Sequence, residues 1–182
     1  IKAKKIIITT GGKSYPRTGS TGDGYKFAKK LGHNITPLYP SLVPLEIKEK
    51  WVKDLQGLSL RNIDLSVLNK QGKEIFKERG EMLFTHFGIS GPLVLSASSH
   101  MRDMNNENYK VIIDLKGALS KDKLDRRIQR DFRKYSNKIF KNSLADLLPS
   151  KLIPVIINLS KIDYDKRVNQ ITREEREDLV KL

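Results

Sequence analysis

The stretch from residue 6 to residue 32, IIITTGGKSYPRTGSTGDGYKFAKKLG, constrains the fold more than any other part of the chain. The apolar, β-branched residues 5–10 predict a buried strand, and a glycine-rich loop follows them. Tyr25, Ala28 and Leu31 then recur at helical spacing, and Gly32 is placed to end a helix. Strand, glycine loop and helix in this order are typical of a nucleotide-binding α/β unit.

The common phosphate-binding and nucleophile motifs do not fit these residues. A P-loop needs a glycine five residues before the Gly-Lys-Ser of residues 12–14, and Ile7 stands there. A dinucleotide fingerprint read from the glycines of TGDG would need its third glycine where Phe27 stands. A nucleophile elbow at Ser90 would need a glycine where Pro92 stands. These spacings argue against a P-loop NTPase, a Rossmann dehydrogenase and a serine hydrolase.

The rest of the chain predicts an α+β protein with a β-rich segment before a helical one. Residues 37–117 carry short alternating runs, with a hairpin turn at residues 69–72 and a helix that Ser90 could cap. Residues 118–182 carry helical periodicity and polar cap signals. Those signals are Ser120, Ser143 with Asp146, Ser150, and Thr172 with Glu175. We therefore expect three parts, covering residues 1–36, 37–117 and 118–182.

Composition limits the classes of site and partner. The chain of 182 residues has no cysteine and three scattered histidines, which argues against disulfides and a zinc site and suits a reducing cytoplasm. Its apolar runs are too short to span a bilayer. A formal charge of +14 raises nucleic acid as a partner, and residues 121–141 hold nine basic and three acidic side chains. A basic nucleic-acid-binding helix is thus the alternative function, although a solvated helix face explains the same charges.

Several segments in order resemble one bacterial flavoprotein family. These are TGGKSYPRTGSTGDGYKFAKKLGH, PLYPSLVPLEI, LQGLSLRNIDLSV, GEMLFTHFGISGPLVLSAS and VNQITREER. They are similar to the YhiN-like, or aminoacetone-oxidase-like, NAD(P)/FAD-dependent oxidoreductases along essentially the whole chain. One departure is Thr9, where that family often has alanine.

The resemblance implies a flavin site and a place for this chain within it. The chain would form a strand-loop-helix part of a split FAD-binding domain, followed by a β-barrel-like and a helical subdomain inserted on the substrate side. It would be the central part of a longer protein, with the remainder of the FAD-binding domain as its partner. NAD(P) could be the electron donor, with NADH, NADPH and oxygen all left open as redox partner, and the substrate would be a small molecule of unknown identity. The cofactor-binding residues would be Thr10, Gly11, Gly12, Gly22, Asp23 and Gly24.

A second group of candidate residues lies in FTHFGISGP. If the inserted part covers a flavin, His86 and Ser90 could act on substrate, because an imidazole exchanges a proton near neutral pH. The backbone at Gly88 and Gly91 could also face substrate. A lone histidine is more often structural, and Asp23 could equally be an ordinary helix-start residue. Tyr15 and Arg17 beside the glycine loop are weaker candidates.

Overall fold

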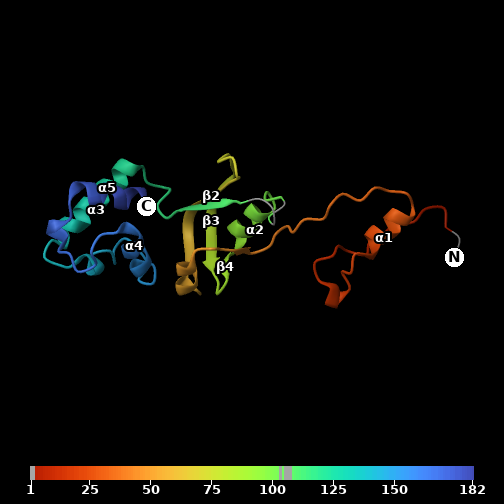
Figure 1. The fold of residues 1–182 in the computed structure, drawn as a ribbon, viewed down its shortest axis with the longest axis horizontal. Coiled ribbons are helices and arrows are strands. Elements are labelled where there is room, and N and C mark those ends of the chain that lie inside the picture. Colours follow the sequence, from red (N-terminus) through yellow and green to blue (C-terminus); the bar gives the residue numbers. More distant parts are fainter. Residues whose placement is uncertain (1–2, 103, 105–107) are drawn as a thin grey trace. The chain divides into compact units, whose positions relative to one another are not determined.

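The computed structural model describes residues 3–102, 104 and 108–182. The chain divides into two compact units, Ile1–Tyr39 and Pro40–Leu182, and each is described by itself. The first unit contains the short 3-10 helix η1 (Pro16–Thr18) and the helix α1 (Asp23–Lys30) (Figure 1). The predicted helix end is confirmed, since Gly32 follows α1 with a φ of 88°.

The strand expected at residues 5–10 is wrong for this structure. These residues are exposed and take no regular secondary structure, and Ile6 and Ile7 are 81% and 87% exposed. A strand needs a neighbour to pair its backbone N–H and C=O groups, and no strand is described elsewhere in the first unit. The apolar pattern therefore marks a segment with strand character but without a sheet to join.

The second unit begins with a curled antiparallel sheet. Its strands are β1 (Leu45–Glu46), β2 (Ser59–Leu68), β3 (Glu74–Phe84), β4 (Gly88–Ser90) and β5 (Lys110–Asp114). They run in the spatial order β1-β4-β3-β2-β5, with every neighbouring pair antiparallel. The sheet is a half-barrel, which confirms the expected α+β class with a barrel-like part.

The hairpin turn between β2 and β3 is confirmed. The side-chain oxygen of Asn69 accepts hydrogen bonds from the backbone of Gln71 and Lys73, at 3.0 and 2.9 Å. Gly72 donates its N–H to the Asn69 carbonyl at 2.9 Å and has a φ of 77°, which a glycine adopts without strain. Asparagine and glycine thus supply the turn between the two longest strands.

The helix α2 (Pro92–Ser98) begins one residue later than the sequence suggested. Gly91 is its N-cap residue, with a φ of 99°, and Pro92 occupies the first turn. Ser90 does not cap the helix, because it is still the last residue of β4 and pairs with Leu83. The backbone reversal needs a positive φ, so it falls on the glycine rather than on the serine.

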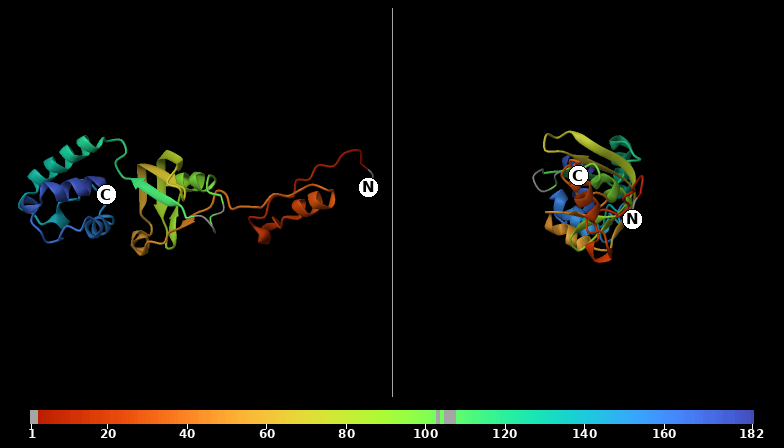
Figure 2. Two further views of the ribbon diagram at one scale, coloured as in Figure 1. Left: turned by 45° about the horizontal axis from the view of Figure 1, so that its top comes forward. Right: turned by 90° about the vertical axis from the view of Figure 1, so that its right-hand side faces the viewer.

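The helical part contains three α-helices in the described chain: α3 (Lys121–Lys134), α4 (Ile153–Ser160) and α5 (Arg173–Lys181). Figures 1 and 2 show these helices gathered on one side of the sheet. Short 3-10 helices complete the unit: η2 (Lys50–Leu55), η3 (Phe140–Asn142) and η4 (Val168–Gln170). One apolar core joins the sheet to the helices, with Leu65, Val67 and Phe84 in the same cluster as Phe140 and Leu144.

The cap predictions had mixed outcomes. Ser120 accepts a hydrogen bond from the Lys123 backbone N–H, and Thr172 with Glu175 forms a capping box, so both are confirmed. Residues 144–148 form turns and no helix, because the Ser143 hydroxyl donates back to the Phe140 carbonyl. The helix α4 starts without a side-chain cap, so the expected role of Ser150 is wrong.

No helix in the described part of the chain combines the length and the apolar character that crossing a membrane requires.

Candidate functional site

The glycine loop and α1 enclose a small hollow in the first unit. Its volume is about 350 Å³. Four of the six predicted cofactor-binding residues line it: Thr10, Gly11, Gly12 and Gly24. Ile8, Thr9, Tyr25 and Ala28 also line it, although nothing in the sequence marked them as ligand contacts. The three-residue spacing of Tyr25 and Ala28 places both on one face of α1, which marks them as helix residues and not as ligand contacts.

Close packing against two side chains explains the glycine at position 24. A Cβ atom at this residue would lie 2.5 Å from the Thr10 hydroxyl oxygen and 3.4 Å from the Ile8 side chain. The first turn of α1 therefore lies directly against the segment before the loop. Gly12 is less confined, with the Tyr25 hydroxyl 3.6 Å from its would-be Cβ. Three of the eight lining residues are glycines, so part of the wall is backbone without side chains.

Gly22 and Asp23 hold the hollow together and do not line it. Gly22 is buried at the N-cap of α1, with a φ of 82°, and donates its N–H to the Gly12 carbonyl at 3.1 Å. Asp23 accepts hydrogen bonds from Lys26 at 2.8 Å and from the Thr21 hydroxyl at 2.7 Å. The Lys26 ammonium and the Thr21 hydroxyl lower the pKa of the Asp23 carboxyl. In this unit Asp23 acts as a helix-start carboxylate, and its contact with a cofactor stays a prediction.

The second group of candidates lies at the turn between β3 and β4. His86 is exposed, and its ring meets the Phe87 ring edge-on with centroids 4.9 Å apart. The Thr85 hydroxyl shapes the turn by accepting the Gly88 backbone N–H at 3.1 Å. Ser90 is half-buried at the end of β4. Both candidates lie within five residues of each other, and their catalytic role stays a prediction.

Gly88 has a structural duty that the sequence did not reveal. A Cβ atom there would lie 2.0 Å from the Leu45 carbonyl oxygen, because β4 runs close beside β1. The glycine is needed for strand pairing, and Gly91 for the start of α2. The sequence could not separate these roles from substrate contact, since both call for glycine in a turn.

A basic face on α3 is the third candidate. Lys123, Arg126, Arg130 and Arg133 recur at spacings of three and four residues, so they share one face of the helix. All four are exposed, whereas Leu124, Ile128 and Phe132 turn toward the core. Within the described residues Lys123, Arg126 and Arg133 have no ion-pair partner, and Arg130 lies 3.6 Å from Asp131. We call these four residues the α3 basic face.

The architecture and the comparisons assign the chain to a family. The second unit is an α+β domain in which a half-barrel sheet shares its core with a group of helices. Residues 39–182 match the family model of the HI0933-like protein barrel and H2TH domain. The chain belongs to that family.

Three curated bacterial relatives are similar to most of this chain. A 3-dehydro-bile acid delta(4,6)-reductase from Clostridium scindens is 28% identical over 98% of the chain and 44% of its own length. Ribosomal RNA dihydrouridine synthases from Escherichia coli and Haemophilus influenzae are 31% and 32% identical, over 99% and 93% of the chain and 42% of their own lengths. The chain spans less than half the length of these relatives. Their reductase-type names agree with the oxidoreductase class that the sequence suggested.

Proposed function

We propose that this chain is part of an FAD-dependent reductase that saturates a carbon–carbon double bond conjugated to a carbonyl group. The glycine hollow of the first unit is the observation that carries the proposal. It forms one wall of the cofactor site, and the second unit forms the substrate side. A cytoplasmic location and NAD(P)H as electron donor belong to the same proposal.

The residues of the hollow fit an extended cofactor that must approach backbone closely. Gly11, Gly12 and Gly24 present no side chains, and Thr10 offers a hydroxyl at the same place. Bound there, FAD would supply a two-electron carrier between a nicotinamide and an oxidised substrate. The protein's own contribution is a backbone wall, a hydroxyl and an aromatic ring from Tyr25.

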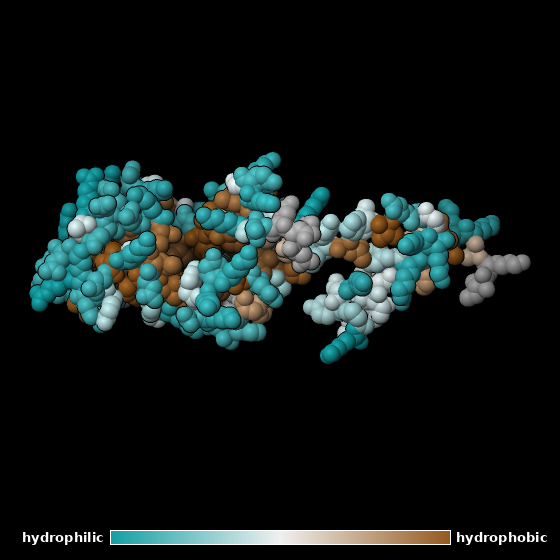
Figure 3. Space-filling model, viewed as in Figure 1, coloured by the Kyte–Doolittle hydropathy of each residue, from teal (hydrophilic) through white to brown (hydrophobic). Residues whose placement is uncertain are grey.

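An exposed apolar segment favours the proposal that the first unit packs against a partner. Ile6, Ile7 and Ile8 are 81%, 87% and 41% exposed, and Figure 3 shows hydrophobic surface on this unit. Leaving three isoleucines in water is unfavourable by about 1.5–3 kcal/mol for each side chain that could be fully buried. The remainder of the FAD-binding domain is the partner we propose, with residues 5–10 joining its sheet as a strand.

The names of the relatives indicate the bond that would be reduced. A delta(4,6)-reductase of a 3-dehydro bile acid and a dihydrouridine synthase share one chemical change, which is saturation of a double bond conjugated to a carbonyl. A hydride equivalent taken from NAD(P)H and carried by FAD would add to the carbon β to the carbonyl, and a proton would add to the α carbon. NAD(P)H becomes NAD(P)⁺, so electrons and atoms balance. His86, with Ser90 at the end of the strand that follows it, is our candidate for delivering that proton.

An anaerobic single-turnover experiment tests this function. The longest natural protein that contains this sequence is reduced with NADH or NADPH, and then mixed with a conjugated steroid ketone or with uridine-containing ribosomal RNA. We expect one acceptor to restore the oxidised flavin spectrum and to be recovered with its double bond saturated. If neither acceptor reoxidises the flavin faster than buffer does, the proposed reaction is wrong.

RNA as substrate is a second candidate that a specific observation favours. The α3 basic face presents four exposed cations along about 15 Å of helix, at 1.5 Å per residue. Phosphate contacts from lysine and arginine position a nucleic acid without reading its sequence. Two of the three relatives are ribosomal RNA dihydrouridine synthases. The α3 basic face is therefore our candidate for holding an RNA backbone.

A further inference from the structure

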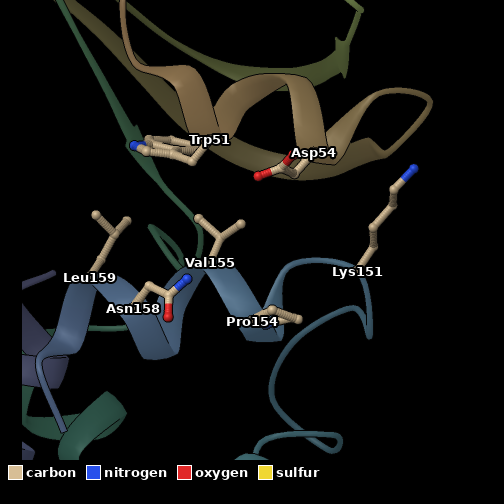
Figure 4. Close-up of a pocket in the computed structure, with 7 residues that line it drawn as sticks. All are labelled: Trp51, Asp54, Lys151, Pro154, Val155, Asn158 and Leu159. Atoms are coloured by element: carbon tan, nitrogen blue, oxygen red, sulfur yellow. The ribbon is translucent and has the colours of Figure 1, made fainter.

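A second cleft lies within the second unit, between η2 and α4 (Figure 4). Its volume is about 400 Å³, which is within the usual range for small-ligand sites. Trp51 and Asp54 line it from η2, and Lys151 with Pro154, Val155, Asn158 and Leu159 line it from α4 and the turn before it. Its lining includes none of the site residues predicted from the sequence and no residue of the α3 basic face.

The polar groups of this cleft are available to a ligand. The Asp54 carboxylate and the Asn158 amide are exposed, and neither has a hydrogen-bond partner within the described residues. The indole N–H of Trp51 likewise has no described partner. Lys151 differs, because its ammonium donates to the Gln56 backbone carbonyl. The cleft therefore offers a free acceptor at Asp54 and a free donor and acceptor at Asn158.

The apolar groups suit a flat ring. Trp51 is half-buried and packs against the core on one side, so its indole is held in place. Leu159 and Val155 stand opposite it on α4 (Figure 4). An aromatic surface facing an aliphatic one, with hydrogen-bonding groups at the edge, is how proteins hold unstacked bases. Asp54 and Lys151 carry opposite charges, so the lining favours a neutral ring over an anion.

We infer that this cleft binds a neutral keto nucleobase, uracil or guanine, stacked on Trp51. The ring's imino N–H donates to the Asp54 carboxylate, and its carbonyl oxygen accepts from the Asn158 amide. Adenine and cytosine offer only amino N–H groups in their neutral forms, and these are weaker donors to a carboxylate than the more acidic imino N–H, so Asp54 favours the keto bases. The inference extends the RNA candidate above, but a free nucleoside presents the same edge, and flavin binding does not enter into it.

The only tryptophan of the chain makes the test direct. Stacking of a base on Trp51 quenches its fluorescence, so the 182-residue chain is titrated with uridine, adenosine, oligouridylate and oligoadenylate. We expect uridine and oligouridylate to quench at concentrations about tenfold or more below those that adenosine and oligoadenylate require. Tighter binding of oligouridylate than of uridine identifies RNA as the source of the base. Equal binding per base identifies a free nucleoside.

Two variants separate specific binding from contact with any aromatic ring. Asp54→Ala removes the acceptor and should abolish the preference for uracil, whereas Glu49→Ala removes another exposed carboxylate, at the start of η2 and outside the lining of the cleft, and should leave it intact. Asn158→Ala should weaken uridine binding in the same way, and melting curves verify that each variant is folded. Absence of quenching by uridine, equal quenching by adenosine, or an Asp54→Ala variant that still prefers uracil would overturn the inference. Flavin content and turnover are measured separately, so a failure here differs from a failure of the reductase proposal.

Discussion

At the scale of single residues, His86 is the main candidate for proton transfer, because its side chain is exposed to solvent. It is exposed in a turn that the Thr85 hydroxyl shapes, and the only ring contact described for it is the edge contact with Phe87. A buried structural histidine would be expected to hold hydrogen-bond partners, and an exposed one adds little to stability. Rigidly held turns often position functional groups. The exposure shows that His86 is not a core residue, and its role in the reaction stays a prediction.

We expect His86→Ala, in the longest natural protein that contains this chain, to slow turnover roughly 100-fold, because a positioned proton donor is removed. The flavin content and the melting temperature should stay nearly unchanged. His100→Ala is the matched control, since His100 is also exposed and its ring lies 5.3 Å from Phe76. A His86→Ala variant that turns over like the His100→Ala variant would remove His86 from the reaction.

The residue scale also shows where sequence reasoning reaches its limit. Thr10, Gly11, Gly12 and Gly24 were named because their segment resembles a flavoprotein glycine motif, and the structure brings these four residues to one hollow. The duties of Gly88 and Gly91 could not be predicted, because contact with β1 and the start of α2 depend on residues far away in the sequence. The cleft at Trp51 was missed for the same reason, since about one hundred residues separate its two sides.

At the scale of secondary structure, local signals predicted elements well wherever one side chain or one turn decides them. The Asn69–Gly72 turn, the Ser120 cap and the Thr172–Glu175 capping box all follow from hydrogen bonds within a few residues. The predictions for residues 5–10 and 144–148 were wrong because contacts beyond the local cap and turn signals also decide these segments; in the second, the Ser143 hydroxyl donates to the Phe140 carbonyl instead of capping a helix. The former have no strand beside them in the first unit, and the latter are held by contacts such as that between Asp146 and Lys134.

At this scale, the proposed binding of RNA by α3 can be tested directly. We expect the Arg126→Glu/Arg133→Glu double variant to bind single-stranded RNA at least about tenfold more weakly. The slope of log affinity against log salt should fall in magnitude by about 1.4, or about 0.7 for each phosphate that the variant no longer neutralises. Fluorescence anisotropy across a salt series measures both. Lys70→Glu/Lys73→Glu, in the β2–β3 turn, is the control with the same change in net charge.

If both double variants bind RNA alike, general charge and not the α3 basic face attracts it. If RNA binding by the unchanged protein discriminates between sequences and resists salt, base contacts dominate, and the phosphate role given to α3 is wrong.

At the scale of the whole molecule, the two units differ in how much apolar core each one has of its own. The second unit has a continuous core of sheet and helices, with Leu65, Val67 and Phe140 fully buried. In the first unit no residue of α1 is buried, and Ile6 and Ile7 are largely exposed. A unit that buries so few side chains depends for its stability mainly on apolar surface that it buries against a partner. We therefore expect the 182-residue chain alone to purify without stoichiometric FAD.

The flavin content of the longest natural protein containing this chain tests the central claim most directly. We predict that this protein purifies with FAD, and that Gly24→Val loses most of it, because a branched side chain would push α1 away from Thr10, which lies 2.5 Å from a Cβ at this position. Lys30→Val, exposed at the far end of α1, should keep its FAD. Absorbance in the flavin bands, normalised to protein, measures all three. Unchanged FAD in a folded Gly24→Val protein, or stoichiometric FAD on the 182-residue chain alone, would contradict the cofactor site described here.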